Sequence, residues 1–457
     1  MFRWPLNCTH DVARSAGRRC VTRKTATLIV AIPLLALVQA CSSPAPPAAD
    51  APDSMEFVNG VKLEGTVKQI RESQKELDFE TTIGERTFTR TYAFSKVHAV
   101  TRNGKRQELT PIAEHARAET DSAPATNEIK PDEVHAIITD AGRNPPDWFD
   151  KTPLNYPKTL DLSWPLKPPT KGWHSQKNMG QYIWSVINEN PGRWHSGIKL
   201  VHHCVALHKD DTTLLERDMQ KLGTMYFTLL QDYPRAAFWY EKAKPSVSRL
   251  NGIRLAECYW RIGNQQMALD MMRGNPLPQG AIKLLGDMGQ IDWALRLTKA
   301  FNKSNSNYQA FILAGDALRQ AEMPDEAIDY YQQVIDSKKF RNKDYEQRFK
   351  ARARESIEAI RLFDQANVSQ VTDGRYRESS TGYAGQVLVE VTVAEGRMKS
   401  VKVIEHKEKQ FYSALTDTTA QLLARQSVQG IDATSGATIT SQAIVNATAS
   451  ALAQGAK

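Results

Sequence analysis

The chain has 457 residues, of which 41% are hydrophobic and 24% are charged, so it is long enough for about three domains with packed cores. The formal net charge is +8, but residues 1–40 hold six basic residues against one acidic residue, and the remainder carries +3. No stripe of Lys and Arg interleaved with aromatic residues is present, so the composition argues against a nucleic-acid-binding protein.

The N-terminus has the pattern of a bacterial export signal. Residues 13–24 are basic, and an apolar run from Thr25 to Val38 follows, too short for a comfortable transmembrane span. The run ends at Ala40-Cys41-Ser42, which resembles a lipobox. We therefore predict that residues 1–40 are a lipoprotein-type signal peptide and that Cys41 carries lipid, which anchors the protein to an envelope membrane, facing the periplasm. The alternative is a plain signal peptide cut near Ala40, which also leads to export.

Two segments follow the predicted lipidation site. Residues 41–54 are rich in Pro and Ala and are predicted to be a linker. Residues 55–110 contain alternating apolar and polar runs at 61–70, 76–83 and 86–92, with Asn-Gly turn signals at 59–60 and 103–104. This pattern predicts a small all-β barrel of the SH3-like or Sm-like kind, used for packing or interaction.

Residues 111–177 are predicted to be a linker rich in Pro and Trp, with a short helix at 131–141. Trp148, Trp164 and Trp173 are expected to pin this extended segment onto a neighbouring domain, because large aromatic side chains bury much apolar area.

The pattern from residue 178 to residue 366 is helical throughout and contains a weak repeat. Alanines at positions 236, 268, 294 and 327 are spaced by 32, 26 and 33 residues, close to the 34-residue tetratricopeptide period with the third repeat shortened. Each is preceded by Leu with Gly or Ala, at 222–223, 255–256, 285 with 289, and 315 with 318. Small residues are needed where paired helices cross closely. The segment resembles tetratricopeptide repeats, which implies an α-helical array that docks partner proteins. The charged stretch Lys343–Phe363 is expected to cap it.

The helical region contains histidine and cysteine residues that could in principle form a metal site or a disulfide. His195, His202, His203 and His208 do not converge on one face of a helix, so we interpret them as packing residues and predict no metal site. Cys204 and Cys258 remain in the mature chain, either as one disulfide or as two buried thiols. No Cys-x-x-Cys-His motif for covalent haem is present.

Residues 371–457 are predicted to be an α+β domain. Val387, Val389, Val391 and Val393 alternate as in a half-buried strand, Glu395-Gly396 forms a turn, and residues 399–405 give the returning strand. Further on, Ser435-Gly436 has the composition of a tight turn. Thr440 or Ser441 is expected to cap a helix from Gln442 to Ala453, which would place Thr438 just ahead of the helix N-terminus, where a phosphate is favoured.

The stretch Asp432-Ala-Thr-Ser-Gly-Ala-Thr438 resembles the Asp-x-x-Ser/Thr-Gly-Ala-Thr/Ser motif of a known family. That family comprises the FMN-binding domains of the C subunit of the sodium-pumping NADH:quinone oxidoreductase and of the G subunit of the Rnf complex. The resemblance implies that a flavin transferase, using FAD and Mg²⁺, links FMN through its phosphate to Thr438. Asp432, Ser435, Gly436 and Ala437 match the remaining motif positions, with Asp432 implied in transferase recognition or in positioning the threonine. One departure is the segment at 405–410, Glu-His-Lys-Glu-Lys-Gln, where the family usually has Glu-Thr and a Gly-rich stretch.

These patterns predict a multidomain, exported and membrane-anchored flavoprotein that acts as an electron carrier. Its helical repeats would dock unknown redox proteins, and FMN would be its redox centre. The alternative is a scaffold lipoprotein that assembles an envelope complex, with a structural or regulatory FMN-binding domain. No sequence motif requires a catalytic pocket, so a redox carrier is expected in preference to a stand-alone enzyme.

Overall fold

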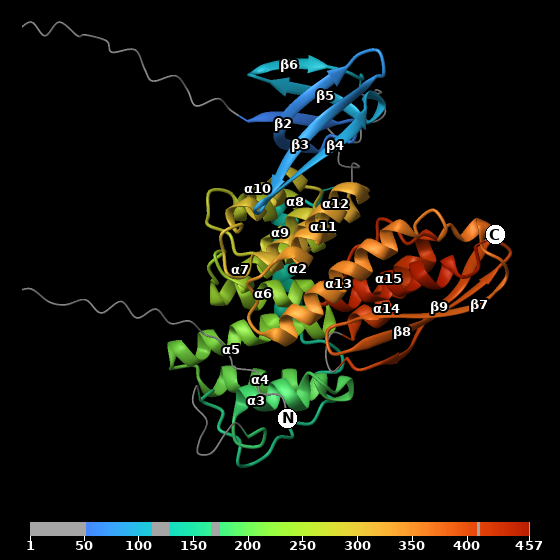
Figure 1. Cartoon of the computed structure of the whole chain (residues 1–457). Coiled ribbons are helices and arrows are strands. Elements are labelled where there is room, and N and C mark those ends of the chain that lie inside the picture. Colours follow the sequence, from blue (N-terminus) through green and yellow to red (C-terminus); the bar gives the residue numbers. More distant parts are fainter. Residues whose placement is uncertain (1–51, 112–127, 166–173, 409–411, 457) are drawn as a thin grey trace, which may run out of the picture. The chain divides into compact units, whose positions relative to one another are not determined.

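The computed structural model describes residues 52–111, 128–165, 174–408 and 412–456. Cys41 and the predicted signal peptide lie outside these described residues. A β-rich region is followed along the chain by many helices and then by an α+β region, in the predicted order (Figure 1). Within the described ranges, no helix combines the length and the apolar character that crossing a membrane requires.

The N-terminal β-rich region is an antiparallel sheet with the strand order β4-β3-β2-β1-β5-β6. Its elements are β1 (Asp53–Phe57), β2 (Lys62–Arg71), β3 (Glu76–Ile83), β4 (Arg86–Ala93), η1 (Phe94–Lys96), β5 (Val97–Arg102) and β6 (Lys105–Glu108). The alternating side chains Leu77 and Phe79 are fully buried. The strands predicted from alternation are confirmed. A closed barrel would require the two edge strands, β4 and β6, to pair with each other. The strand order has them at opposite ends of the sheet, so the barrel stays a prediction.

The Trp-containing segment after this sheet is fixed to the helices. It begins with α2 (Pro131–Arg143). Farther on, the Trp148 ring stacks on His195 with 4.0 Å between ring centroids, and the buried Trp164 indole N–H donates to Asp218 Oδ1 at 2.6 Å. The predicted pinning is therefore confirmed for these two tryptophans. Trp173 lies outside the described residues.

The middle of the chain is a run of helices, which we call the helical array. Its elements are α3 (Met179–Tyr182), η2 (Ile183–Ile187), η3 (Pro191–Arg193), α4 (Trp194–Leu207), α5 (Thr212–Met225), η4 (Tyr226–Leu230), α6 (Tyr233–Ala243), α7 (Leu250–Ile262), α8 (Gln265–Met272), α9 (Ala281–Asp287), α10 (Ile291–Ala300), α11 (Asn307–Gln320), α12 (Pro324–Asp336) and α13 (Lys343–Arg361).

Consecutive helices of the array pack closely where a small residue faces an aromatic ring. A Cβ atom built on Gly223 of α5 would lie 2.6 Å from the Tyr240 ring of α6, and one on Gly315 of α11 would lie 2.7 Å from the Tyr331 ring of α12. Contacts this short leave no room for a side chain, so glycine is required for both helix pairs to approach. The tetratricopeptide assignment itself stays a prediction.

The C-terminal region follows η5 (Val368–Gln370) and consists of a sheet with two helices. The strands β7 (Gly374–Thr381), β8 (Gln386–Ala394) and β9 (Arg397–His406) are antiparallel in the order β7-β8-β9, and α14 (Ser413–Arg425) and α15 (Thr438–Ala453) pack on them (Figure 1). The predicted β8–β9 hairpin is confirmed, with both Glu395 and Gly396 at positive φ in the turn. The four alternating valines of β8 are buried, which supplies the hydrophobic face for α15.

Polar contacts join the array to this C-terminal region within the unit Asp50–Lys457. The buried Arg319 of α11 donates to the Asn446 side chain of α15. Glu355 of α13 accepts from the hydroxyl groups of Ser380 and Thr381, each at 2.6 Å. The helices of the array therefore contact the part of the chain that carries the predicted flavin motif.

Candidate functional site

The predicted motif forms the connection between α14 and α15, which we call the motif loop (residues 432–438). Gly436 has φ +74°, a left-handed conformation that favours glycine, and the Ala437 N–H donates to the Thr434 carbonyl at 2.8 Å. These two features form the tight turn expected from Ser435-Gly436. Ala437 and Ser435 are buried, whereas Gly436 is exposed and Thr438 is half-buried.

The helix after the loop begins earlier than its sequence suggested. Thr438 is the first residue of α15, and Ala437 occupies the N-cap position with no side-chain cap. The prediction that Thr440 or Ser441 caps this helix is therefore wrong, since both lie buried inside its first turns. Ser441 Oγ instead accepts a hydrogen bond from the Thr434 N–H at 3.0 Å. The helix can therefore begin at Thr438, because the Ser441 side chain, inside α15, bonds to the loop backbone and does not cap the helix.

This arrangement places the Thr438 hydroxyl at an electropositive end of a helix. The first N–H groups of an α-helix have no acceptor within the helix, and α15 has no capping side chain to supply one. The helix dipole adds a partial positive charge at the same end. A phosphate joined to Thr438 would therefore lie where backbone donors and the dipole favour negative charge.

Helix α14 holds the backbone of the loop from its own domain. The Gln421 side chain accepts from the Asp432 N–H at 3.0 Å and donates to the Asp432 carbonyl at 2.8 Å. Asp417 Oδ2 accepts from the Thr434 hydroxyl at 2.7 Å. Three hydrogen bonds from α14 therefore hold residues 432–434 of the loop independently of the helical array.

The side chains of the loop are engaged by the helical array. Asp432 Oδ2 lies 2.7 Å from Arg261 Nη1 of α7, and Asp432 Oδ1 lies 3.9 Å from Lys283 Nζ of α9. The buried Ser435 hydroxyl donates to Glu257 Oε1, also on α7. The motif aspartate and serine thus face α7, with Ser435 buried and the Asp432 side chain 24% exposed.

A second element of the array reaches the tip of the loop. A Cβ atom on Gly436 would lie 3.3 Å from the Thr228 methyl carbon of η4, so a side chain there would crowd this neighbour. Tyr233 of α6 also lies beside Ser435, which lowers the pKa of Tyr233 while burial raises it overall. Positions 228, 233, 257 and 261 therefore surround one side of the motif.

The charges around Asp432 are partly buried and depend on one another. Burial lowers the pKa of Arg261, but attraction to Asp432 and Glu257 outweighs it, so the pKa of Arg261 is raised. For Lys283, burial again opposes the charge, and the nearby Asp287 and Asp432 raise its pKa. Burial raises the pKa of Asp287 to about 7, against the lowering effect of Lys283.

The departure from the family pattern at residues 405–410 supplies a buried carboxylate. Glu408 Oε1 accepts from the backbone N–H groups of Tyr383 at 2.7 Å and Ala384 at 3.2 Å, and the Thr440 hydroxyl lies beside the carboxylate. Burial raises the pKa of Glu408, although these donors lower it. Glu408 therefore closes the β7–β8 turn and lies beside the first turn of α15.

Other groups considered from sequence lie apart from the loop. His195 stacks on Trp148, His202 packs among the rings of Phe149, Tyr226 and Trp239, and His208 bonds to Asp218. No group of three metal-ligating side chains occurs in the part of the chain that the structure describes. Cys204 and Cys258 are buried free thiols, so the disulfide alternative is not what the structure shows.

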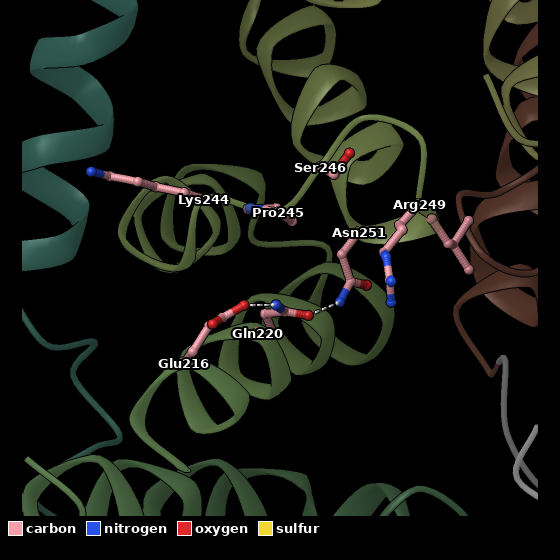
Figure 2. Close-up of a pocket in the computed structure, with 8 residues that line it drawn as sticks. Glu216, Gln220, Lys244, Pro245, Ser246, Arg249 and Asn251 are labelled. Carbon is pink, nitrogen blue, oxygen red and sulfur yellow. Dashed lines mark hydrogen bonds between the residues drawn. The ribbon is translucent and has the colours of Figure 1, made fainter. Parts of the chain in front are cut away.

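A cavity of about 730 Å³ in the array does not include the motif loop. It lies between α5 and the connection from α6 to α7, where Glu216, Gln220 and Asn251 form a chain of hydrogen bonds (Figure 2). Its lining contains none of residues 432–438. The candidate flavin site therefore rests on the loop and its helix terminus, not on this cavity.

Comparison with known proteins supports the assignment of the C-terminal region. Residues 382–453 match the family model described as an FMN-binding domain. An uncharacterized protein of Treponema pallidum (strain Nichols) is 33% identical over 88 residues, which are 19% of this chain and 24% of that protein. No solved structure matches the chain significantly. The chain thus carries a C-terminal FMN-binding domain, and the motif loop lies inside the matched region.

The residues present fit an FMN group at this position. The exposed glycine leaves backbone at the loop tip accessible, and the threonine hydroxyl stands at an uncapped helix terminus. Sequence reasoning found these features because they are local. It did not find Glu257, Arg261 or Lys283, since an i, i+4 pair such as Glu257 and Arg261 has the signature of an ordinary surface ion pair.

Proposed function

We propose that this protein is an exported, lipid-anchored electron carrier that holds FMN through a covalent bond to Thr438. The observation that carries the proposal is the placement of Thr438 at the uncapped N-terminus of α15, inside a region that matches FMN-binding domains. The flavin would supply the redox chemistry, and the chain would supply attachment, orientation and electrostatics. A covalent bond suits an exported protein, because a diffusible cofactor would be lost outside the cytoplasm.

Attachment needs a flavin transferase and FAD as the donor. The Thr438 hydroxyl oxygen would form a bond to the flavin-side phosphorus of FAD, the bond between the two phosphates would break, and AMP would leave. The hydroxyl proton passes to a base of the transferase or to water. In this chain Gly436 keeps the loop tip open to the incoming phosphate, and the first N–H groups of α15 offset its charge.

The test is the mass and fluorescence of the full-length protein from cells that contain a flavin transferase. We expect the denatured, washed protein to show flavin fluorescence and an intact mass increased by one FMN group less one water. The Thr438→Ala variant is expected to lose both signals, while Thr416→Ala, on an exposed part of α14, keeps them. Unmodified wild-type protein from such cells would contradict the carrier and leave the envelope scaffold as the function.

The lipid anchor and the location are tested separately. We expect Cys41 to carry the lipid, so the intact mass of mature protein reports lipid and flavin together. Replacing Cys41 by Ala is expected to move the protein from the membrane fraction to the soluble periplasmic fraction without loss of flavin. Retention in the membrane fraction would argue against lipidation at this residue.

We further propose that the helical array docks redox partner proteins. The array makes up much of the chain outside the matched domain and contacts the motif loop directly, so a partner bound there would be close to the flavin. Cross-linking of the array to a periplasmic or membrane electron donor, with faster flavin reduction by that donor, would support this assignment.

A further inference from the structure

Two side chains that hold the motif loop come from outside the FMN-binding domain. Arg261 and Glu257 belong to α7, more than a hundred residues before the matched region 382–453. One binds the Asp432 carboxylate at 2.7 Å, and the other accepts the Ser435 hydroxyl hydrogen. An FMN-binding domain alone therefore lacks part of the environment that its own motif has in this protein.

These contacts bind some residues of the loop to α7 and leave others accessible to solvent. Asp432 and Ser435 point to α7, and Ala437 is buried beneath the turn. Gly436 is exposed and Thr438 is half-buried. Because the side chains of Asp432 and Ser435 are bound to α7, that helix adds to the restraints that α14 and Ser441 place on the loop before Thr438.

Arg261 is the charge on which the arrangement depends. Its guanidinium contacts Asp432 at 2.7 Å and lies 3.8 Å from Glu257, so one cation offsets two carboxylates. Lys283 does not substitute for it, since Lys283 is paired with Asp287 and stays 3.9 Å from Asp432. Without Arg261, the partly buried carboxylates of Asp432 and Glu257 would both lose their nearest cation, which is costly in a site of low dielectric.

We propose that α7 is the second half of the flavin-attachment site, with Arg261 and Glu257 as positioning residues that hold the motif loop so that Thr438 is presented to the transferase. The inference rests on the proposed function. It assigns to the helical array a role in cofactor attachment, in addition to the docking of partners.

The experiment measures flavin transfer to full-length apo-protein with purified flavin transferase, FAD and Mg²⁺. We expect Arg261→Gln and Glu257→Gln to lower the initial rate of covalent flavin incorporation roughly tenfold, which corresponds to about 1.4 kcal/mol. Arg261→Lys should restore part of the rate, because it returns the charge but not the guanidinium that lies near both Asp432 and Glu257. The matched control is Arg273→Gln at the C-cap of α8, whose ion pair with Asp270 is largely exposed.

A second measurement does not depend on flavin. Hydrogen exchange of residues 431–441 is followed in the Thr438→Ala protein, with and without Arg261→Gln. We expect the loop to exchange about tenfold faster when Arg261 is replaced, and expect no such change with Arg273→Gln. If Arg261→Gln fails to fold, the same exchange measurement is made on Glu257→Gln, which preserves the shape of the side chain.

The outcomes separate this inference from the proposed function. Wild-type incorporation rates and unchanged exchange in the Arg261 and Glu257 variants would overturn the role of α7. Faster incorporation in Arg261→Gln would also overturn it, since α7 would then restrain the loop from the transferase. A wild-type protein that never accepts flavin overturns the proposed function, and with it the positioning role, whatever the exchange shows.

Discussion

At the scale of single residues, the conformation of the motif loop depends on Gly436. Its positive φ allows the turn, and the missing side chain allows Thr228 of η4 to approach. Gly274, after α8, has nearly the same φ of +75°, yet nothing lies within 4 Å of a Cβ built there. The two glycines therefore share a backbone conformation but differ in their surroundings.

This difference gives a prediction for the Gly436→Ala variant. The left-handed backbone should cost about 1–2 kcal/mol in both Gly436→Ala and Gly274→Ala, measured by urea unfolding. We expect Gly436→Ala alone to reduce covalent flavin incorporation, because its methyl group displaces the loop from Thr228. Equal incorporation by the two variants would show that loop position does not matter for attachment.

At the scale of elements, the linker is fixed to the array by a buried hydrogen-bond network. Asp218 of α5 is fully buried and accepts from the Trp164 indole at 2.6 Å, while its other oxygen lies 2.6 Å from His208 Nδ1. Burial raises the pKa of Asp218, and His208 and Trp164 lower it. The pKa of Asp218 is raised overall, and the network holds the extended segment in place.

We expect Trp164→Phe to destabilise the protein by about 1–3 kcal/mol, since Asp218 would lose a donor while remaining buried. The measurement is the free energy of unfolding in urea. Trp293→Phe on α10, a half-buried tryptophan that packs against apolar residues, is the control for lost aromatic area. A similar cost in both variants would mean that area, not the hydrogen bond, matters at Trp164.

At the scale of the whole molecule, the array and the C-terminal domain share a charged network that responds to pH. Asp287 of α9 is buried, and its pKa is raised by burial to about 7. Because this pKa is higher in the folded than in the unfolded protein, the proton on Asp287 stabilises the fold. That stabilisation is present at low pH and is lost as the pH rises through 7.

We therefore expect the free energy of unfolding to increase by about 1 kcal/mol from pH 8 to pH 6 through Asp287 alone. Asp287→Asn should lack this increment, whereas Asp270→Asn, at an exposed pair on α8, should keep it. Urea unfolding of the three proteins at both pH values measures the difference. An Asp287→Asn protein with the wild-type pH dependence would contradict the assignment.

The sequence by itself determined the features that depend on neighbouring residues. The alternating valines of β8, the Glu395-Gly396 turn and the Ser435-Gly436 turn follow from local periodicity and backbone preference, and the structure contains each of them. The motif also predicted the FMN-binding domain that the family match supports. Local pattern misplaced the start of α15, because it could not foresee that Ser441 bonds back to Thr434.

Only the tertiary structure decided what surrounds the motif. Ser435 and Glu257 are 178 positions apart, and no periodicity links them. Their contact, and that of Asp432 with Arg261, exists because α7 packs beside the loop in the folded chain. Partners of this kind depend on the packing of whole elements, so a sequence pattern that is read locally does not contain them.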